Sequence, residues 1–286
     1  MKSTSKIMII SFITNFVLSI IKVLVGIIGN SSSLIADGIH SFSDLITDLV
    51  ALFGNVLSGK PEDKEHPYGH GRLEYLTSIL IGSLVLMIGL TLIGSVAHKD
   101  YQIPNKIVVI VSFFTIISKY LLSRYLIIKG KVFDNQILVS SGKESAADVY
   151  SSIIVLVASI LMQFEYVFHP LIYTDKIATI IVGIFIVMTG FNILKENINI
   201  LIGLHESDTD YYDEIRKIIL ENDEIKRIDS LIVMKYGYYY TLTLEVSMNP
   251  KLTLKQAHDE VEKIENNLRK NNDRTKYINI HMNPYS

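Results

Sequence analysis

Carboxylates and a histidine recur at helical spacing inside an otherwise apolar stretch of the chain. Asp37, His40, Asp44 and Asp48 all lie in the segment Leu34–Leu57. At about 100° per residue they fall within an arc of about 100° on one helix face. Each carboxylate at the centre of a bilayer costs about 2.5–3.5 kcal/mol on insertion scales. Three such carboxylates therefore require a water-filled cavity, a charged partner or a bound cation.

A second apolar segment, Leu138–Met162, repeats the pattern. Glu144 and Asp148 are four residues apart, so their side chains stack on one helix face. Two facing helices then present four nitrogen and oxygen ligands to one point: His40, Asp44, Glu144 and Asp148. Such a tetrahedral set suits Zn²⁺, and its oxygen content also accepts Mn²⁺ or Fe²⁺. The alternative is that these groups form interhelical hydrogen bonds or line water without holding an ion.

A third polar cluster lies in the loop between residues 60 and 72. Asp63, His66 and His70 have the residue types and the closeness in sequence to surround a second ion near the cytoplasmic surface. As a bare pattern, however, a short polar loop with two histidines is usually only a loop without a metal.

Two charged residues of the apolar segments have less specific roles. Lys22 lies about 10 Å by helical rise from the end of its segment, so we expect its ammonium to reach the outer lipid headgroups. Asp37 and Asp48 share the polar helix face, where they either pass protons along a water path or form hydrogen bonds between helices.

The elements that must position these residues are membrane spans. The chain has 286 residues, 49% of them hydrophobic, and a mean hydropathy of +0.33, which is too apolar for an ordinary soluble protein. A span needs about 20 apolar helical residues. Six segments meet that length: Ile7–Ile28, Leu34–Leu57, Leu73–Val96, Ile107–Ile128, Leu138–Met162 and Ile177–Leu201.

The charge and cysteine content exclude several classes of function. Twenty-seven Lys and Arg residues against 29 Asp and Glu leave a net charge of −2, so there is no broad basic surface for nucleic acid. The absence of cysteine excludes disulfides, thiolate zinc sites and a cysteine nucleophile. Lys and Arg concentrate in the loops on the N-terminal side of the membrane, which predicts that both termini are cytoplasmic.

The composition changes after about residue 204, and the remaining residues are charged and regularly patterned. A helix is expected over 209–222, strands over 228–235 and 239–248, and a last strand over 276–282. Thr253 and Gln256 have the capping-box spacing that opens a helix to about Asn271. We therefore predict an all-α membrane domain of six helices over residues 1–204 and a small α-β-β-α-β domain over residues 205–286.

The six spans, the string Ser32–Asp44 and the loop His66–Arg72 together resemble the cation diffusion facilitators, over essentially the whole chain. The resemblance implies a homodimeric exporter in the cell membrane that exchanges a divalent transition metal for protons by alternating access. It also implies that the C-terminal domain is a ferredoxin-like, metallochaperone-like cytoplasmic domain.

The resemblance carries ligand sets onto particular positions. It assigns the transport site to His40, Asp44, Glu144 and Asp148, and the loop site to Asp63, His66 and His70. It implies a regulatory metal between the C-terminal domains of two subunits at Glu245, His258 and His281. The position of Glu144 is commonly His in zinc exporters and Asp or Asn in manganese exporters, so Zn²⁺, Mn²⁺, Fe²⁺ and Co²⁺ all stay open.

A physical mechanism follows from the polar stripes. A carboxylate in a poorly solvated cavity prefers its neutral form, whereas a metal binds only deprotonated ligands, so metal and protons exclude each other. Two rival functions remain. One is a membrane metal sensor that signals through its C-terminal domain. The other is a membrane metalloenzyme, which would need an open coordination position and a general base, and no HExxH motif occurs.

Overall fold

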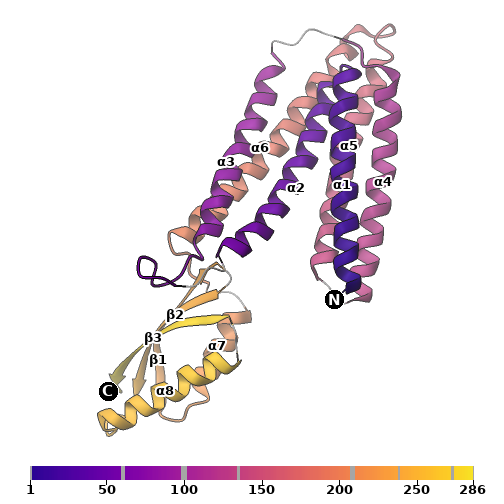
Figure 1. Cartoon of the computed structure of the whole chain (residues 1–286). Helices are drawn as coiled ribbons and strands as arrows, with labels where there is room; N and C mark the ends of the chain where they lie inside the picture. Colours follow the sequence, from indigo (N-terminus) through magenta and orange to yellow (C-terminus); the bar gives the residue numbers. More distant parts are fainter. Residues whose placement is uncertain are drawn as a thin grey trace. The chain divides into compact units, whose positions relative to one another are not determined.

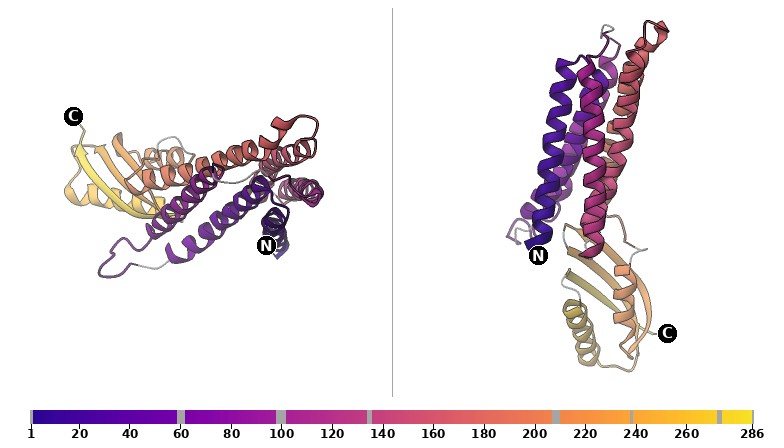
Figure 2. Two further views of the ribbon diagram at one scale, coloured as in Figure 1. Left: turned by 90° about the horizontal axis from the view of Figure 1, so that it is seen from above. Right: turned by 90° about the vertical axis from the view of Figure 1, so that its right-hand side faces the viewer.

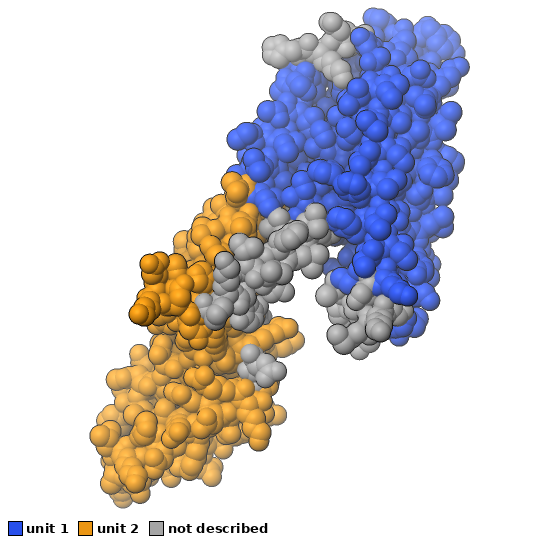
Figure 3. Space-filling model, in the orientation of Figure 1, with its two compact units in different colours: residues 1–49, 81–192 blue, residues 50–80, 193–286 orange. Residues whose placement is uncertain are grey.

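The computed structural model describes residues 2–58, 62–97, 102–133, 136–206, 210–237, 239–271 and 274–285, the side chains of residues 2–5, 47–58 and 136–137 excepted. The chain forms two compact units (Figure 3). Unit 1 comprises Met1–Leu49 and Ile81–Asn192, and unit 2 comprises Val50–Leu80 and Ile193–Ser286. This division does not follow the predicted domain boundary at residue 204, which stays a prediction.

Long helices lie at the positions of the six predicted spans (Figure 1). They are α1 (Lys2–Ile28), α2 (Ser32–Ser58), α3 (Leu73–Ser95), α4 (Lys106–Val132), α5 (Gln136–Met162) and α6 (Thr174–Leu201), with a short 3₁₀ helix, η1 (His169–Tyr173), before α6. Within the described residues, α1, α3, α4, α5 and α6 contain stretches long and apolar enough to cross a membrane. The remaining helix, α2, carries the polar stripe.

Unit 1 is held together by helix packing around an apolar core. α4 packs along α5, and α1 packs along α4 (Figure 2). The core draws residues from most of the helices: Leu34, Ala36, Val85, Val108, Val155, Val182 and Ile186. Close packing of α3 and α6 depends on glycine, because a Cβ at Gly190 would lie 2.6 Å from the backbone nitrogen of Leu86. Small residues permit this approach in membranes, where lipid removes the usual hydrophobic drive between helices.

A buried carboxylate from α6 caps the N-terminus of α2. Asp175 accepts hydrogen bonds from the backbone nitrogens of Ser32 (2.9 Å) and Ser33 (3.3 Å) and from the hydroxyl groups of Ser31 (2.9 Å) and Ser33 (2.5 Å). The first N–H groups of a helix have no partner within the helix, and a carboxylate there also complements the helix dipole. Asp175 thereby fixes the start of the helix that carries His40 and Asp44.

The C-terminal domain has the predicted α-β-β-α-β order. It comprises α7 (Asp210–Leu220), β1 (Ile225–Tyr236), β2 (Tyr239–Met248), α8 (Leu254–Asn271) and β3 (Thr275–Pro284). The sheet order is β1-β2-β3, with β1 and β2 antiparallel and β2 and β3 parallel. The parallel pair requires a crossover, which α8 provides. The start of the predicted first helix, Thr209, lies outside the described residues.

Both helices of this domain cover the same face of the sheet. Ile215 and Ile219 of α7 and Ile264 and Leu268 of α8 share one core with alternate residues of the strands. The predicted capping box is confirmed: the Thr253 nitrogen donates to the Gln256 side chain at 2.9 Å, and the Gln256 nitrogen donates to the Thr253 hydroxyl at 3.3 Å. Together the helical membrane part and this small α/β domain confirm the predicted fold class.

Candidate functional site

Three of the predicted transport ligands meet inside unit 1. His40 and Asp44 of α2 and Asp148 of α5 each offer one ligand atom, and these atoms all lie within 4.8 Å of one another. The spacing of four residues places His40 and Asp44 on the same side of α2. Asp148 is only 7% exposed, and the other two side chains are partly buried. The structure therefore forms one polar cluster between two helices, in the membrane-spanning part of the chain.

Glu144 is not part of this cluster. Its side chain is exposed, although it lies one turn before Asp148 on the same helix. The buried side of α5 instead runs through Ser145, Asp148 and Ser152. Four residues correspond to about 40° around the helix, so Glu144 lies on the same side of α5 as Asp148, and its position around the helix does not by itself explain its exposure. The structure brings three of the four predicted ligands together, and the complete four-ligand set stays a prediction.

The chemistry of the cluster fits a divalent cation. His40 Nδ1 is buried and has no hydrogen-bond partner in the described part of the chain, and it lies 3.8 Å from Asp44 Oδ2. A buried polar atom without a hydrogen bond is costly unless some other group satisfies it. One imidazole nitrogen and two carboxylates form a donor set used by Zn²⁺, Mn²⁺ and Fe²⁺. These residues suit a metal ion that passes through the membrane as cargo.

A lysine outside the predicted ligand sets contacts one of the three ligands. Lys119 of α4 is 1% exposed, and its Nζ forms an ion pair and hydrogen bond with Asp148 Oδ2. A signal was present in the sequence: Ser112, Thr115, Lys119 and Ser123 recur at spacings of three and four residues within the apolar segment, and all four are buried. This stripe faces α5, since the Ser123 hydroxyl donates to the Gly142 carbonyl at 2.7 Å.

The prediction for Lys22 was wrong. Its side chain is fully buried and does not reach lipid headgroups: Nζ lies 2.8 Å from Asp37 Oδ2 and donates to the hydroxyls of Ser152 (2.9 Å) and Ser41 (3.2 Å). Asp37 also accepts hydrogen bonds from Ser151 and Ser152, both at 2.8 Å. A paired, hydrogen-bonded ammonium no longer needs water. Asp37 thus joins α1, α2 and α5, while the side chain of Asp48 lies outside the described residues.

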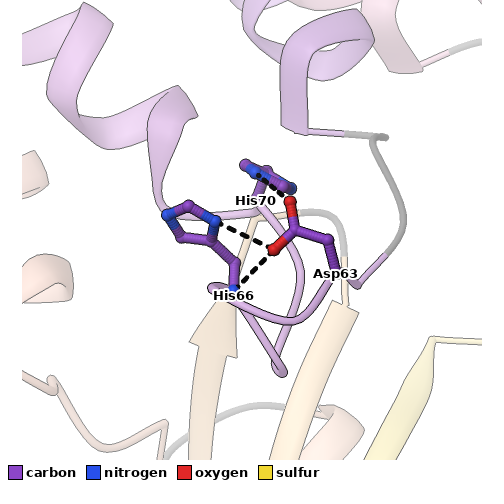
Figure 4. A group of neighbouring side chains, drawn as sticks. All are labelled: Asp63, His66 and His70. Atoms are coloured by element: carbon purple, nitrogen blue, oxygen red, sulfur yellow. Dashed lines mark hydrogen bonds and ion pairs between the residues drawn. The ribbon is translucent and has the colours of Figure 1, made fainter.

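The loop site is assembled within a few residues of sequence (Figure 4). Asp63, His66 and His70 offer ligand atoms within 4.8 Å of one another. Asp63 Oδ1 lies 3.1 Å from His66 Nδ1, and Oδ2 lies 3.5 Å from His70 Nε2. The backbone N–H of His66 donates to Asp63 Oδ1 at 2.6 Å, and this bond is the main cause that lowers the pKa of Asp63. The carboxylate is consequently ionised at neutral pH, as a metal ligand must be.

The loop that carries this site is anchored to the C-terminal domain, and both belong to unit 2. Its described part, residues 62–72, forms neither a helix nor a strand, so such contacts fix its path. Three hydrogen bonds between described residues join them: Lys276 Nζ to Glu62 Oε2 at 2.6 Å, the Tyr277 hydroxyl to the Pro67 carbonyl at 3.3 Å, and the Tyr239 hydroxyl to the Tyr68 carbonyl.

The proposed ligands of the C-terminal domain do not meet within one chain. Glu245 of β2 and His281 of β3 are register partners and are both exposed. Strand alternation places them on the face opposite the core, whereas His258 is exposed on α8, which covers the core face. A site that uses all three residues would therefore require a second chain.

A helical membrane domain that gathers carboxylates and an imidazole between its spans defines the class: a multi-pass membrane protein that handles metal cations. Residues 8–202 match the cation efflux transmembrane domain, and residues 207–285 match the cytoplasmic domain of cation efflux proteins. The chain therefore belongs to the cation diffusion facilitator family and is a cation efflux transporter, not an enzyme.

Relatives extend over nearly the whole chain. An uncharacterized transporter of Methanocaldococcus jannaschii is 32% identical over 272 residues, which cover 94% of each chain. The manganese efflux system protein MneP of Bacillus subtilis is 27% identical and matches 98% of this chain and 96% of its own length. The cadmium, cobalt and zinc/H(+)-K(+) antiporter of Bacillus subtilis is 26% identical and matches 93% of this chain and 85% of its own length.

Proposed function

We propose that the protein exports a divalent transition-metal ion in exchange for protons by alternating access. The meeting of His40, Asp44 and Asp148 between two membrane helices carries the proposal. A divalent ion binds only the deprotonated forms of these side chains, so a proton gradient that reprotonates them from the far side ejects the metal. Glu144 is the proposed fourth ligand. A rearrangement of α5 during the transport cycle would bring it to the ion.

The proposed substrate class comprises Zn²⁺, Mn²⁺, Fe²⁺ and Co²⁺. The donor set is rich in oxygen, which is compatible with Mn²⁺ and Fe²⁺ as well as Zn²⁺. The names of the relatives support the same range, since one is a manganese efflux protein and another a cadmium, cobalt and zinc antiporter coupled to H⁺. Thiolate ligands play no part, because the chain has no cysteine.

The proposed setting is a homodimer in the cell membrane with both termini in the cytoplasm. The distribution of Lys and Arg between the loops supports this orientation, and so does the match of residues 207–285 to a domain described as cytoplasmic. The loop site and the Glu245, His258 and His281 positions are proposed to bind regulatory metal, the latter between two subunits.

Flux into proteoliposomes with an imposed pH gradient tests the proposal. The purified chain is expected to move at least one of Zn²⁺, Mn²⁺, Fe²⁺ and Co²⁺ against the proton flow. Asp44→Asn and Asp148→Asn should abolish the flux, while Asp259→Asn, the same change at an exposed position of α8 in the C-terminal domain, serves as the matched control. Correctly inserted protein that transports none of the four metals would refute the proposal.

A further inference from the structure

Two lysines are fully buried among the described residues, and they differ in what they pair with. Lys22 pairs with Asp37, which is not a member of the metal cluster. Lys119 pairs with Asp148, which is a member of the metal cluster. A buried ammonium requires a partner, but nothing in helix packing requires that partner to be a transport ligand. The placement of Lys119 therefore calls for an explanation in terms of the transported ion.

We propose that the side-chain ammonium of Lys119 competes with the transported metal for the carboxylate of Asp148. This inference rests on the proposed function and adds a residue from a third helix, α4, to the site. In the metal-free site the ammonium compensates the charge of Asp148. The incoming metal takes that carboxylate, and the ammonium moves away.

Charge and geometry make the two cations exclusive at this carboxylate. Nζ of Lys119 is bonded to Asp148 Oδ2, and a metal ion lies about 2.0–2.2 Å from a carboxylate oxygen that it binds. A divalent ion and an ammonium held on one carboxylate would be within a few ångströms of each other in a poorly solvated site, where like charges repel strongly. The bond to Lys119 must therefore lengthen or break when the metal binds.

The side chain has room to move along its own helix. Lysine has a flexible four-carbon stem, and helical side chains lean toward the N-terminus of the helix. The groups one and two turns in that direction are Thr115 and Ser112, both buried on the same stripe of α4. Ser112 Oγ has no hydrogen-bond partner in the part of the chain that the structure describes. These hydroxyls are suitable acceptors for the displaced ammonium.

Competition weakens metal binding and favours release. If the ammonium holds Asp148 for about nine-tenths of the time, the apparent affinity falls about tenfold, because only the remaining fraction is competent to bind. The same factor helps the metal to leave on the far side of the membrane. If Lys119 had a purely structural role, it would neither weaken metal binding nor favour metal release. Its removal would then leave the affinity for the metal unchanged or lower it.

Equilibrium binding of Zn²⁺ and Mn²⁺ to the full chain in lipid nanodiscs tests the proposal. Asp63→Ala and His70→Ala are present throughout to remove the loop site, and His258→Ala and His281→Ala to remove the site proposed in the C-terminal domain. Lys119→Gln should lower the Kd about tenfold, and Lys119→Arg, which keeps the charge, should leave it near the parent value. The matched control, Lys22→Met combined with Asp37→Leu, removes the other buried lysine together with its partner and should not tighten binding. A folded Lys119→Gln protein with unchanged or weaker affinity overturns the proposal.

Two further measurements separate the possible failures. If Asp44→Asn and Asp148→Asn do not weaken binding, the cluster is not the metal site, and the proposed function fails with it. If they weaken binding but Lys119→Gln does not strengthen it, only the role of Lys119 is refuted. Should Lys119→Gln fail to fold, an experimental structure of the parent chain with metal decides. Nζ is expected to have left Asp148, and a retained bond would make Lys119 a positioning residue and refute competition.

Discussion

Replacing Lys22 by methionine is expected to destabilise unit 1 strongly. The substitution keeps the volume but leaves Asp37 as a buried carboxylate that only the hydroxyls of Ser151 and Ser152 satisfy. Removal of one partner of a buried ion pair costs about 3–5 kcal/mol. Replacing both partners by apolar residues of similar size is often neutral, so Lys22→Met combined with Asp37→Leu should lie within about 1 kcal/mol of the parent. In this thermodynamic cycle, adding Asp37→Leu should therefore restore about 3 kcal/mol of the stability that Lys22→Met removes.

The free energy of unfolding in mixed detergent micelles, followed by far-ultraviolet circular dichroism, measures this cycle. Lys263→Met is the control, because it breaks an exposed pair with Glu260 on α8 and should cause no measurable change. The reasoning is refuted if Lys22→Met costs less than about 1 kcal/mol, which would mean that Asp37 is hydrated. It is also refuted if the double variant is as unstable as the single one, since the loss would then come from packing and not from charge.

Three further predictions concern the helix cap, the transport site and the C-terminal domain. Asp175→Ala should destabilise the chain by about 2 kcal/mol in the same micelle assay, because it leaves the N-terminal donors of α2 without their acceptor; no loss would show that water caps α2. Glu144→His should shift transport preference toward Zn²⁺ relative to Mn²⁺ in proteoliposomes, whereas an unchanged metal ranking would exclude this position from selectivity. Hydrogen bonds from Ser247 and Arg227 lower the pKa of Asp229 below its ordinary 3.8; the carboxylate therefore stabilises the sheet above that value and loses its effect as the pH falls through the lower folded-state pKa. The difference in melting temperature between the parent and Asp229→Asn should accordingly be present near neutral pH and vanish in acid, and a difference independent of pH would contradict it.

Features that depend on neighbours in the sequence were predictable. Periods of 3.6 and 2 residues predicted the long helices and the alternating strands, and the Thr253 and Gln256 spacing predicted a capping box that the structure confirms. The loop cluster of Asp63, His66 and His70 belongs to the same class, because a single turn of chain brings its members together.

Contacts between helices were not predictable from these patterns. Periodicity fixes the side of a helix on which a residue lies, but it does not say which other helix faces that side. This is why Lys22 was expected at the headgroups, although it pairs with Asp37. Glu144 shows the same limit, since it lies only about 40° from Asp148 around α5 and its side chain is nevertheless exposed.

The sequence alone determined that carboxylates and a histidine line one side of α2, because the cost of placing charge in lipid makes any such stripe conspicuous. Only the tertiary structure decided which cation each carboxylate meets. Asp37 faces Lys22 of α1, and Asp148 faces Lys119 of α4 as well as His40 and Asp44 of α2. The physical reason is that charge pairing depends on distance in space, and residues far apart in the chain come within that distance only when the helices pack.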